Sequence, residues 1–204
     1  MRFVLFVEGP TEKKALPGFF KRWLDPQLKE PVGIQVVRFN GWPELIKDSP
    51  VKAGMHLKRE DVIAVVALLD LYGPTIYPND KTTASARYEW AKQHLESKVN
   101  RQCFRQFFAV HETEAWLLSE PTLFPRPIRD ALPAVSRPEE IDFDQPPSKL
   151  LGRIYRDKMR RTYKKVTHGK ELFDKLDPKV ACGKCPRLRE LLEEILRMAK
   201  ARGL

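Results

Sequence analysis

Acidic side chains stand where three apolar runs of the sequence end. Glu8 directly follows RFVLFV, Asp70 directly follows VIAVVALL, and Glu112 and Glu114 come just after RQCFRQFFAV. Carboxylate oxygens are hard ligands that bind Mg²⁺, Mn²⁺ or Ca²⁺ in preference to zinc. Gathering them costs several kcal/mol in repulsion and desolvation unless a cation offsets their charge. If the three runs are parallel strands, this pattern predicts a divalent-metal site at one edge of a sheet.

A further carboxylate, Glu12, follows Glu8 in FVEGPTEKKA, where the first apolar run gives way to a helical pattern. Gly9 permits a tight turn or a close approach of the backbone that a larger residue would resist. Thr11 is the expected cap of the helix. Glu12 then falls in the first helical turn, where the helix dipole favours an anion. Its role stays open between a helix-start carboxylate and an additional metal ligand.

Short β-rich runs alternate with longer helical patterns over the first 120 residues. The runs are rich in Val, Ile and Phe and cover 2–7, 34–39, 62–69 and 101–110. Between them, stretches such as TEKKALPGFFKRWL and ASARYEWAKQHLESKV repeat apolar residues at helical spacing. This alternation indicates an α/β fold with a mostly parallel sheet covered on both faces. Ligands of such sheets bind outside the carboxyl ends of the strands, where these acids stand.

Proline is concentrated after HETEAWLLSEP, which argues against a regular strand or a long helix there. The prolines stand at 121, 125, 127, 133, 138, 146 and 147. The last third of the chain is helical in pattern and strongly basic. We therefore expect one domain, with an α/β core over 1–120 and a proline-rich connection and helical elaboration over 121–204.

The chain carries 37 Lys and Arg against 27 Asp and Glu, a formal net charge of +10. This excess favours a polyanionic partner, nucleic acid above all, although a solvated basic surface is the alternative. The longest apolar run, 62–69, is far shorter than the ~20 residues of a bilayer-spanning helix, so we expect a cytoplasmic protein without a membrane partner. Three cysteines agree with a reducing compartment. CGKC lacks the second ligand pair of a structural zinc site.

Six motifs occur in order from residue 1 to about residue 196: VEGPTE, LLDLYG, HETEAWLLSEP, RPEEIDFDQPPSKLL, YKKVTHGKELFDKL and CPRL. This ordered set resembles the Toprim-like family DUF4276. The resemblance implies a compact parallel sheet between helices, with strand-end acids that bind Mg²⁺ or Mn²⁺. Related Toprim proteins include topoisomerases, DnaG-type primases and nucleases of the overcoming-lysogenization-defect class. Members look like bacterial defence proteins, often encoded beside an ATPase of the AAA or SMC-like type.

The resemblance also implies roles for individual acids. Glu8 matches the first Toprim acid, Asp70 matches the first acid of the usual Asp-x-Asp pair, and Glu112 and Glu114 match the downstream acids of the family. Tyr72 stands where the second aspartate of that pair is expected. The metal site must therefore be completed by Glu114 or Glu12, or it binds its ion more weakly.

Several basic residues fall at or near the family motifs. Lys149 in PPSK is the expected cation for the charge that develops in phosphoryl transfer. The expected nucleic-acid contacts are Arg160, Arg161, Lys164, Lys165 and His168. The other interpretation of the lysines is a solvated helix face. For His168, a loop hydrogen bond competes with a role as general acid or base.

Two functions follow from these residues. The first is a metal-dependent nuclease that cuts phosphodiester bonds of DNA or RNA, as the effector of an anti-phage system with a partner ATPase. In it, Glu8 is a metal ligand or general base, Asp70 and Glu112 are ligands, and Lys149 stabilises the transition state. The second is a non-catalytic Toprim module that binds nucleic acid or nucleotide and docks on an ATPase. The missing acid at Tyr72 favours the second, and the remaining acids favour the first.

Overall fold

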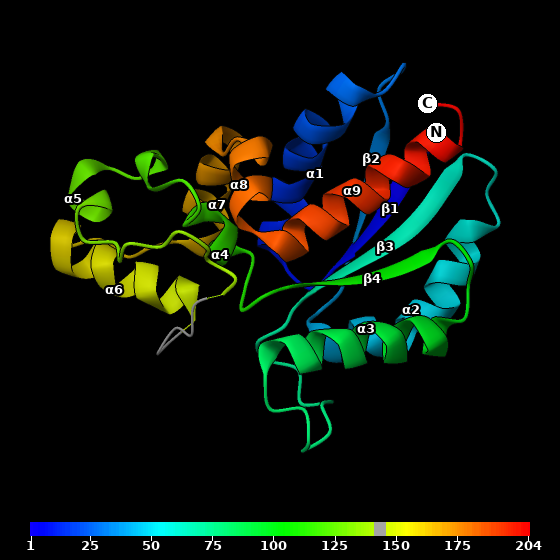
Figure 1. The fold of residues 1–204 in the computed structure, drawn as a ribbon, viewed down its shortest axis with the longest axis horizontal. Helices are drawn as coiled ribbons and strands as arrows, with labels where there is room; N and C mark the ends of the chain where they lie inside the picture. Colours follow the sequence, from blue (N-terminus) through cyan, green and yellow to red (C-terminus); the bar gives the residue numbers. More distant parts are fainter. Residues whose placement is uncertain (141–145) are drawn as a thin grey trace.

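A four-stranded parallel sheet forms the centre of the molecule (Figure 1). The computed structural model describes residues 1–140 and 146–204. The strands are β1 (Arg2–Val7), β2 (Gly33–Arg38), β3 (Val62–Asp70) and β4 (Phe104–Ala109). Their order is β2-β1-β3-β4, and each neighbouring pair is parallel. The predicted parallel sheet is confirmed, with strand bounds within a few residues of the apolar runs.

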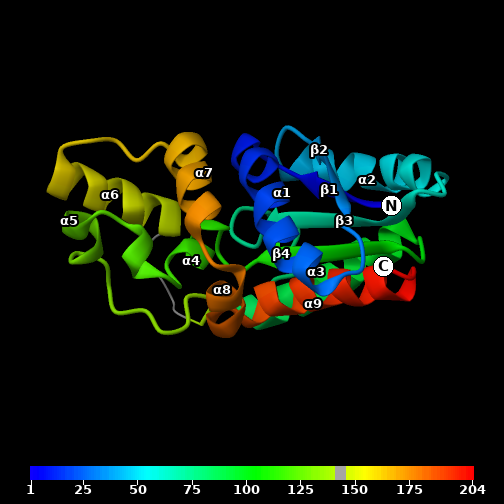
Figure 2. The ribbon, with the colours of Figure 1, turned by 90° about the horizontal axis from the view of Figure 1, so that it is seen from above.

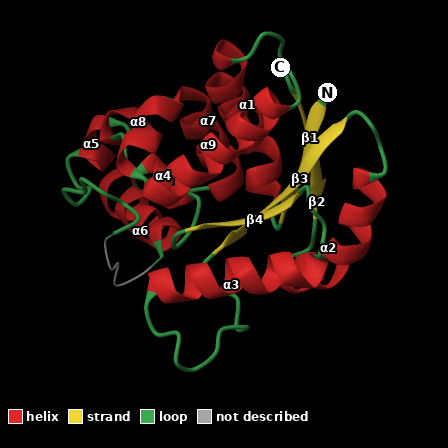
Figure 3. Ribbon diagram, turned by 45° about the vertical axis from the view of Figure 1, so that its right-hand side comes forward, coloured by secondary structure: helices red, strands yellow, loops and turns green. Residues whose placement is uncertain are grey.

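Helices cover both faces of this sheet (Figure 3). α2 (Trp42–Leu57) and α3 (Ala84–Val99) lie on one face. α1 (Pro10–Leu24) and α9 (Pro186–Ala201) lie on the other. The periodicity of the sequence predicts the α3 span without error. In the described part of the chain, no helix is long and apolar enough to cross a lipid bilayer.

The remaining elements are short or lie beyond the carboxyl ends of the strands, away from both termini (Figure 2). They are η1 (Asp25–Gln27), α4 (Glu114–Leu117), η2 (Pro121–Leu123), α5 (Arg126–Arg129), α6 (Pro147–Met159), α7 (Lys165–Lys175) and α8 (Pro178–Lys184). The segment 121–140 thus holds only two short helical turns, as its prolines predict. Part of the motif RPEEIDFDQPPSKLL, residues 141–145, lies outside the described residues.

Alternation along β1 divides the core into two layers. Phe3, Leu5 and Val7 pack under α1 and α9, whereas Val4 and Phe6 pack against the α2 and α3 side. β3 is central and buried at every position, which explains its unbroken apolar sequence. The sheet is therefore rigid where its strands end, and those ends position the acids.

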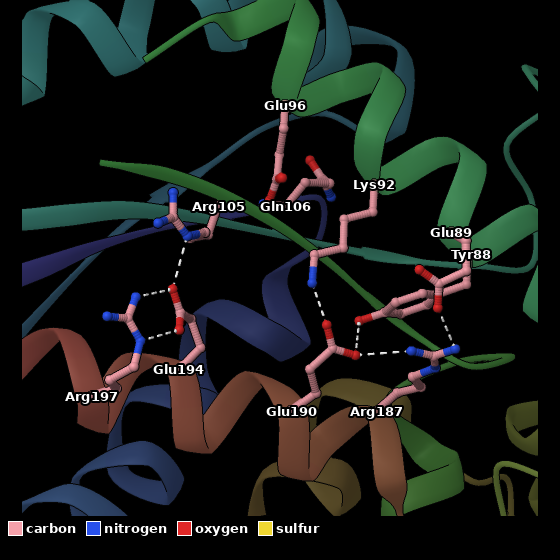
Figure 4. Close-up of polar contacts among 10 residues, drawn as sticks. All are labelled: Tyr88, Glu89, Lys92, Glu96, Arg105, Gln106, Arg187, Glu190, Glu194 and Arg197. Carbon is pink, nitrogen blue, oxygen red and sulfur yellow. Dashed lines mark hydrogen bonds and ion pairs between the residues drawn. The ribbon is translucent and has the colours of Figure 1, made fainter. Parts of the chain in front are cut away.

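Charged side chains fasten the last helix to the β4 side of the sheet (Figure 4). The carboxylate of Glu190 on α9 accepts hydrogen bonds from Tyr88 and Lys92 on α3. One turn further along α9, Glu194 pairs with Arg105 of β4 and with Arg197. Because β4 is an edge strand, these contacts also cover an edge that would otherwise be open to pairing with another chain.

Glu139 connects the proline-rich segment to the start of α9. Its Oε1 accepts hydrogen bonds from Nε1 of Trp116 at 3.1 Å and from the Leu188 N–H at 3.2 Å, and its Oε2 accepts one from the Arg187 N–H at 2.7 Å. Burial raises the pKa of Glu139, and these donors oppose that rise. A carboxylate at a helix amino terminus satisfies N–H groups that lack partners within the helix.

Candidate active site

The strand-end acids converge at one edge of the sheet, as the sequence predicts. β1, β3 and β4 are parallel, so Glu8 after β1, Asp70 at the end of β3 and Glu112 after β4 all lie at the carboxyl ends of their strands. The Asp70 N–H donates a hydrogen bond to Oε1 of Glu8 at 3.3 Å. The Thr113 N–H donates to Oδ1 of Asp70 at 3.1 Å. The three strand ends are thus joined through their acidic residues.

Lys165 is the cation at the centre of this group. Its Nζ lies 3.1 Å from Oε2 of Glu114, 3.6 Å from Oε1 of Glu112 and 3.8 Å from Oδ2 of Asp70. The three carboxylates raise the pKa of Lys165 despite its burial, so it stays charged. The sequence places Lys165 among nucleic-acid contacts, whereas the structure places it among the acids. Its charge offsets part of the repulsion between them.

Glu114 is the most deeply buried of the acids, with a fully buried side chain. Burial is the main reason that its pKa rises to about 7, and Lys165 opposes this rise. Its Oε1 has no hydrogen-bond partner among the described residues. A buried carboxylate oxygen without a donor is costly, so this atom is suited to receive a cation or a water molecule.

Asp70 and Glu8 also have raised pKa values. Burial is the main cause for Asp70, and repulsion from Glu12, Glu8 and Glu114 adds to it. Burial likewise raises the pKa of Glu8, while the Asp70 N–H opposes the shift. The group as a whole is short of positive charge, which is the condition under which a metal ion stabilises a protein site.

Glu12 folds back over the turn that precedes α1. A Cβ built on Gly9 would lie 2.5 Å from Oε2 of Glu12, so the glycine leaves room for that carboxylate. The expected cap at Thr11 is wrong: α1 begins at Pro10 with Gly9 as N-cap, and Thr11 is buried inside the first turn. Pro10 at the first helical position has no N–H, so it removes one of the donors that lack a partner at the start of a helix.

The PPSK motif meets the site through its serine. Ser148 donates its N–H to Oε2 of Glu112 at 2.9 Å and its hydroxyl to Oε1 at 3.0 Å. Lys149 is exposed in the first turn of α6. Ser148 is not among the site residues that the sequence predicts. Its position at the start of a helix, where N–H groups bind carboxylates, could have indicated such a contact.

Three of the five expected nucleic-acid contacts lie on the surface. Arg160, Arg161 and Lys164 are exposed in the segment between α6 and α7, which leads directly to Lys165. His168 accepts a hydrogen bond at Nδ1 from the Lys164 N–H at 2.9 Å and stacks on Tyr155. His168 thus makes a local backbone hydrogen bond, but it does so from the first turn of α7 and not from a loop.

Tyr72 is exposed over 60% of its surface, although Asp70 and Leu71 before it are buried. Its N–H donates to the carbonyl oxygen of His111 at 3.1 Å, which fixes the backbone beside the acids. An acidic residue at this position would point to the surface from the same backbone. The two acids expected to take the place of the missing aspartate, Glu114 and Glu12, are both buried.

The acids fit a hard cation by chemistry, since the group is all carboxylate and includes the unpartnered Oε1 of Glu114. In this arrangement of residues 1–140 and 146–204, there is no group of three or more Asp, Glu, His or Cys side chains placed to hold a metal ion. Lys165 lies where the acids meet. Binding of an ion therefore requires these side chains to shift and Lys165 to give up part of its contacts.

Comparison with known proteins agrees with this fold. The model of the family described as "Domain of unknown function (DUF4276)" matches residues 7–196. The C-terminal region of the Burkholderia pseudomallei OLD protein aligns with a TM-score of 0.50 and 16% identity, over 97% of this chain and 98% of that chain. The corresponding region from Xanthomonas campestris pv. campestris aligns with a TM-score of 0.50 and 19% identity, over 98% and 97%. No curated protein sequence matches the chain.

Proposed function

The chain belongs to the DUF4276 family and has a Toprim-like fold, and from this premise we propose that it is a metal-dependent nuclease acting on DNA or RNA. The observation that carries the proposal is the cluster of five acids with Lys165, which directly follows the basic segment 160–164 in the chain. This segment, called here the basic turn, exposes Arg160, Arg161 and Lys164. The acids suit a cation, and the basic turn suits a phosphate backbone.

In this proposal Glu8, Asp70, Glu112 and Glu114 hold Mg²⁺ or Mn²⁺, and Glu12 completes the set. The ion supplies positive charge for the phosphate oxygens as the P–O bond breaks. Water adds to phosphorus, and the leaving oxygen takes a proton from solvent. As the alternative to a ligand role, Glu8 accepts the proton of the attacking water as general base.

Other residues prepare the site for this reaction. Ser148 fixes the orientation of Glu112 with two hydrogen bonds. Lys165 would offer its charge to the phosphate together with Lys149. Arg160, Arg161 and Lys164 bind neighbouring phosphates of the strand. We further propose that the nuclease serves antiviral defence with a partner ATPase, as the family resemblance implies.

A second candidate is a module that binds nucleic acid or nucleotide without cutting it. Two observations favour it: Tyr72 stands where an acid is expected, and Lys165 already lies within ion-pair distance of three carboxylates. Such a module keeps the basic turn and has no use for an ion. The two candidates differ in whether the chain cleaves nucleic acid and in the effect of replacing Glu8.

The test is a Mn²⁺-dependent cleavage assay beside salt titrations of oligonucleotide binding, with and without a partner ATPase. Glu8→Gln is expected to abolish cleavage and to leave affinity unchanged or higher, because it removes a carboxylate near the phosphate. Unaltered cleavage by this variant removes Glu8 from the reaction. Failure of the wild type to cut under every condition favours the binding module.

The matched comparison neutralises Arg160 and Arg161. These substitutions are expected to weaken binding to all sequences and to reduce the salt dependence by about one unit of slope per lost phosphate contact. They leave the acids and Lys165 in place. Cleavage at saturating oligonucleotide is therefore expected to survive, which separates binding from chemistry.

A further inference from the structure

A groove of about 1160 Å³ lies at the end of the sheet opposite to the acids. Its lining includes the second half of α2, the residues that begin β3 and the residues that precede β4. Val62 opens β3 at the groove, whereas Asp70 closes the same strand at the acids. The groove is thus separated from the proposed active site by the length of the strands.

Two exposed aliphatic side chains stand at the rim of this groove. Val51 is 68% exposed and Met55 is 65% exposed. Both lie on α2 with the spacing that places side chains on one face of a helix. Neighbouring apolar groups gain free energy when a partner removes them from water. Methionine also adapts its shape to different apolar partners.

Cations surround these apolar groups. Lys58, Arg59, Arg101 and Arg202 line the groove, with Glu60 as the one acid in the lining. Within the described part of the chain, Arg59 pairs with Asp61, and no carboxylate lies at ion-pair distance from the other three cations. This end of the molecule therefore combines an apolar rim with positive charge that the chain itself does not neutralise.

The two arginines lie against neighbouring backbone. Arg101 packs against α2 at Gly54, where a Cβ would lie 3.4 Å from its Nη2, an ordinary contact distance. Nη2 of Arg202 donates to the carbonyl oxygen of Glu60 at 3.1 Å. Side chains that are already positioned lose less conformational entropy when a partner binds.

We propose that this groove docks an acidic segment of a partner protein, with aliphatic side chains against Val51 and Met55 and carboxylates on the surrounding cations. Nucleic acid fits less well, because a phosphate backbone has nothing to bury against a valine and a methionine, and base stacking uses aromatic side chains. A partner bound here leaves the acid edge open. The inference does not depend on whether that edge cleaves nucleic acid.

The test is a selection of short random peptides on phage against the purified chain. Enriched peptides are expected to be acidic and to contain at least two aliphatic residues. The affinity of synthetic copies for the chain is then measured by fluorescence anisotropy. The double variant Met55→Asp with Arg101→Glu, called the groove variant, is expected to weaken peptide binding by about tenfold or more. It removes apolar contact and reverses a charge. Both residues are exposed, and an unchanged unfolding midpoint verifies the fold of the variant.

A second readout locates the peptide. Cys103 lines the groove and is partly exposed, whereas Cys182 and Cys185 are buried. Bound peptide is expected to slow alkylation of Cys103. The matched control is Arg160→Glu with Arg161→Glu, which is expected to keep peptide affinity and to lose oligonucleotide affinity.

Three results would overturn the proposal. They are the absence of enriched acidic peptides, equal peptide affinity for the groove variant, and unprotected Cys103 in the complex. Loss of oligonucleotide affinity in the groove variant would assign this surface to nucleic acid instead. Since no readout is cleavage, failure of this proposal is distinguishable from failure of the nuclease proposal.

Discussion

Nζ of Lys165 lies 3.1 Å from Oε2 of Glu114, and this contact joins α7 of the last third of the chain to α4 directly after β4. The Glu114 side chain is fully buried, so its charge depends on that neighbour. The same ammonium also approaches Asp70 and Glu112. The basic elaboration thus contributes one residue to the acid cluster itself, while Lys164, just before it, remains on the surface.

Lys165→Met is expected to destabilise the metal-free protein by about 2–4 kcal/mol at pH 8, less than for a fully buried pair because the lysine side chain is 34% exposed. The loss follows from leaving three acids without their counter-charge. Added Mg²⁺ is expected to recover part of it. Urea unfolding in EDTA and in Mg²⁺ measures both effects.

The control for this variant is its neighbour. Lys164→Met removes an exposed lysine and is expected to change stability by no more than about 0.5 kcal/mol. Equal losses in the two variants would show that Lys165 does not support the acids.

Mg²⁺ or Mn²⁺ is expected to raise the unfolding midpoint of the wild type, because an ion that binds the folded state stabilises it by mass action. The rise is expected to be much smaller in Asp70→Ala, which lacks an acid at the centre of the group. Thermal unfolding over a metal titration measures it. Asp80→Asn, at an exposed acid in the loop after β3, is the control and is expected to respond like the wild type. Equal rises in all three proteins would place the ions elsewhere.

The raised pKa of Glu114 predicts a loss of stability as pH rises. Its pKa is about 7 in the folded protein, against the ordinary value of 4.5 that applies to the unfolded chain. Between these two pH values the folded state therefore binds more protons than the unfolded state. Stability from this group is full below pH 4.5 and is lost as pH rises to about 7, on the order of 3 kcal/mol in total.

Glu114→Gln is expected to flatten that part of the stability profile in EDTA. Glu171→Gln, at an exposed residue of α7, is expected to leave the profile unchanged. Denaturant unfolding at a series of pH values decides the matter, and an unchanged slope in Glu114→Gln would assign the titration to another group.

Glu139→Gln is expected to cost about 1–3 kcal/mol, because the carboxylate accepts three hydrogen bonds and an amide would turn a donor toward one of them. The adjacent Glu140→Gln is the matched control, since Glu140 pairs with Arg137 at the surface. Surface pairs contribute little, so a change below about 1 kcal/mol is expected there. Similar values for the two variants would contradict a capping role for Glu139.

The primary sequence determined the sheet and the placement of its acids. Apolar runs long enough for strands, separated by helical patterns, leave few arrangements other than a parallel α/β sheet. In such a sheet the carboxyl ends of strands share an edge, so Glu8, Asp70 and Glu112 meet without any further information. The helix at 84–99 was equally predictable from the helical spacing of its apolar residues, and the structure adds Thr83 as its cap.

Tertiary structure alone decided which residues of the last third reach that edge. Lys164 and Lys165 are identical in type and adjacent in sequence, yet one is exposed and the other contacts three acids. Which lysine turns inward depends on where α7 begins and on its packing against α1, a contact between segments far apart in the chain. The same holds for Ser148 and Lys149, where the start of α6 directs the serine to Glu112 and the lysine to solvent. Local sequence patterns carry the period of a helix, but its rotation about its own axis is set by what it packs against.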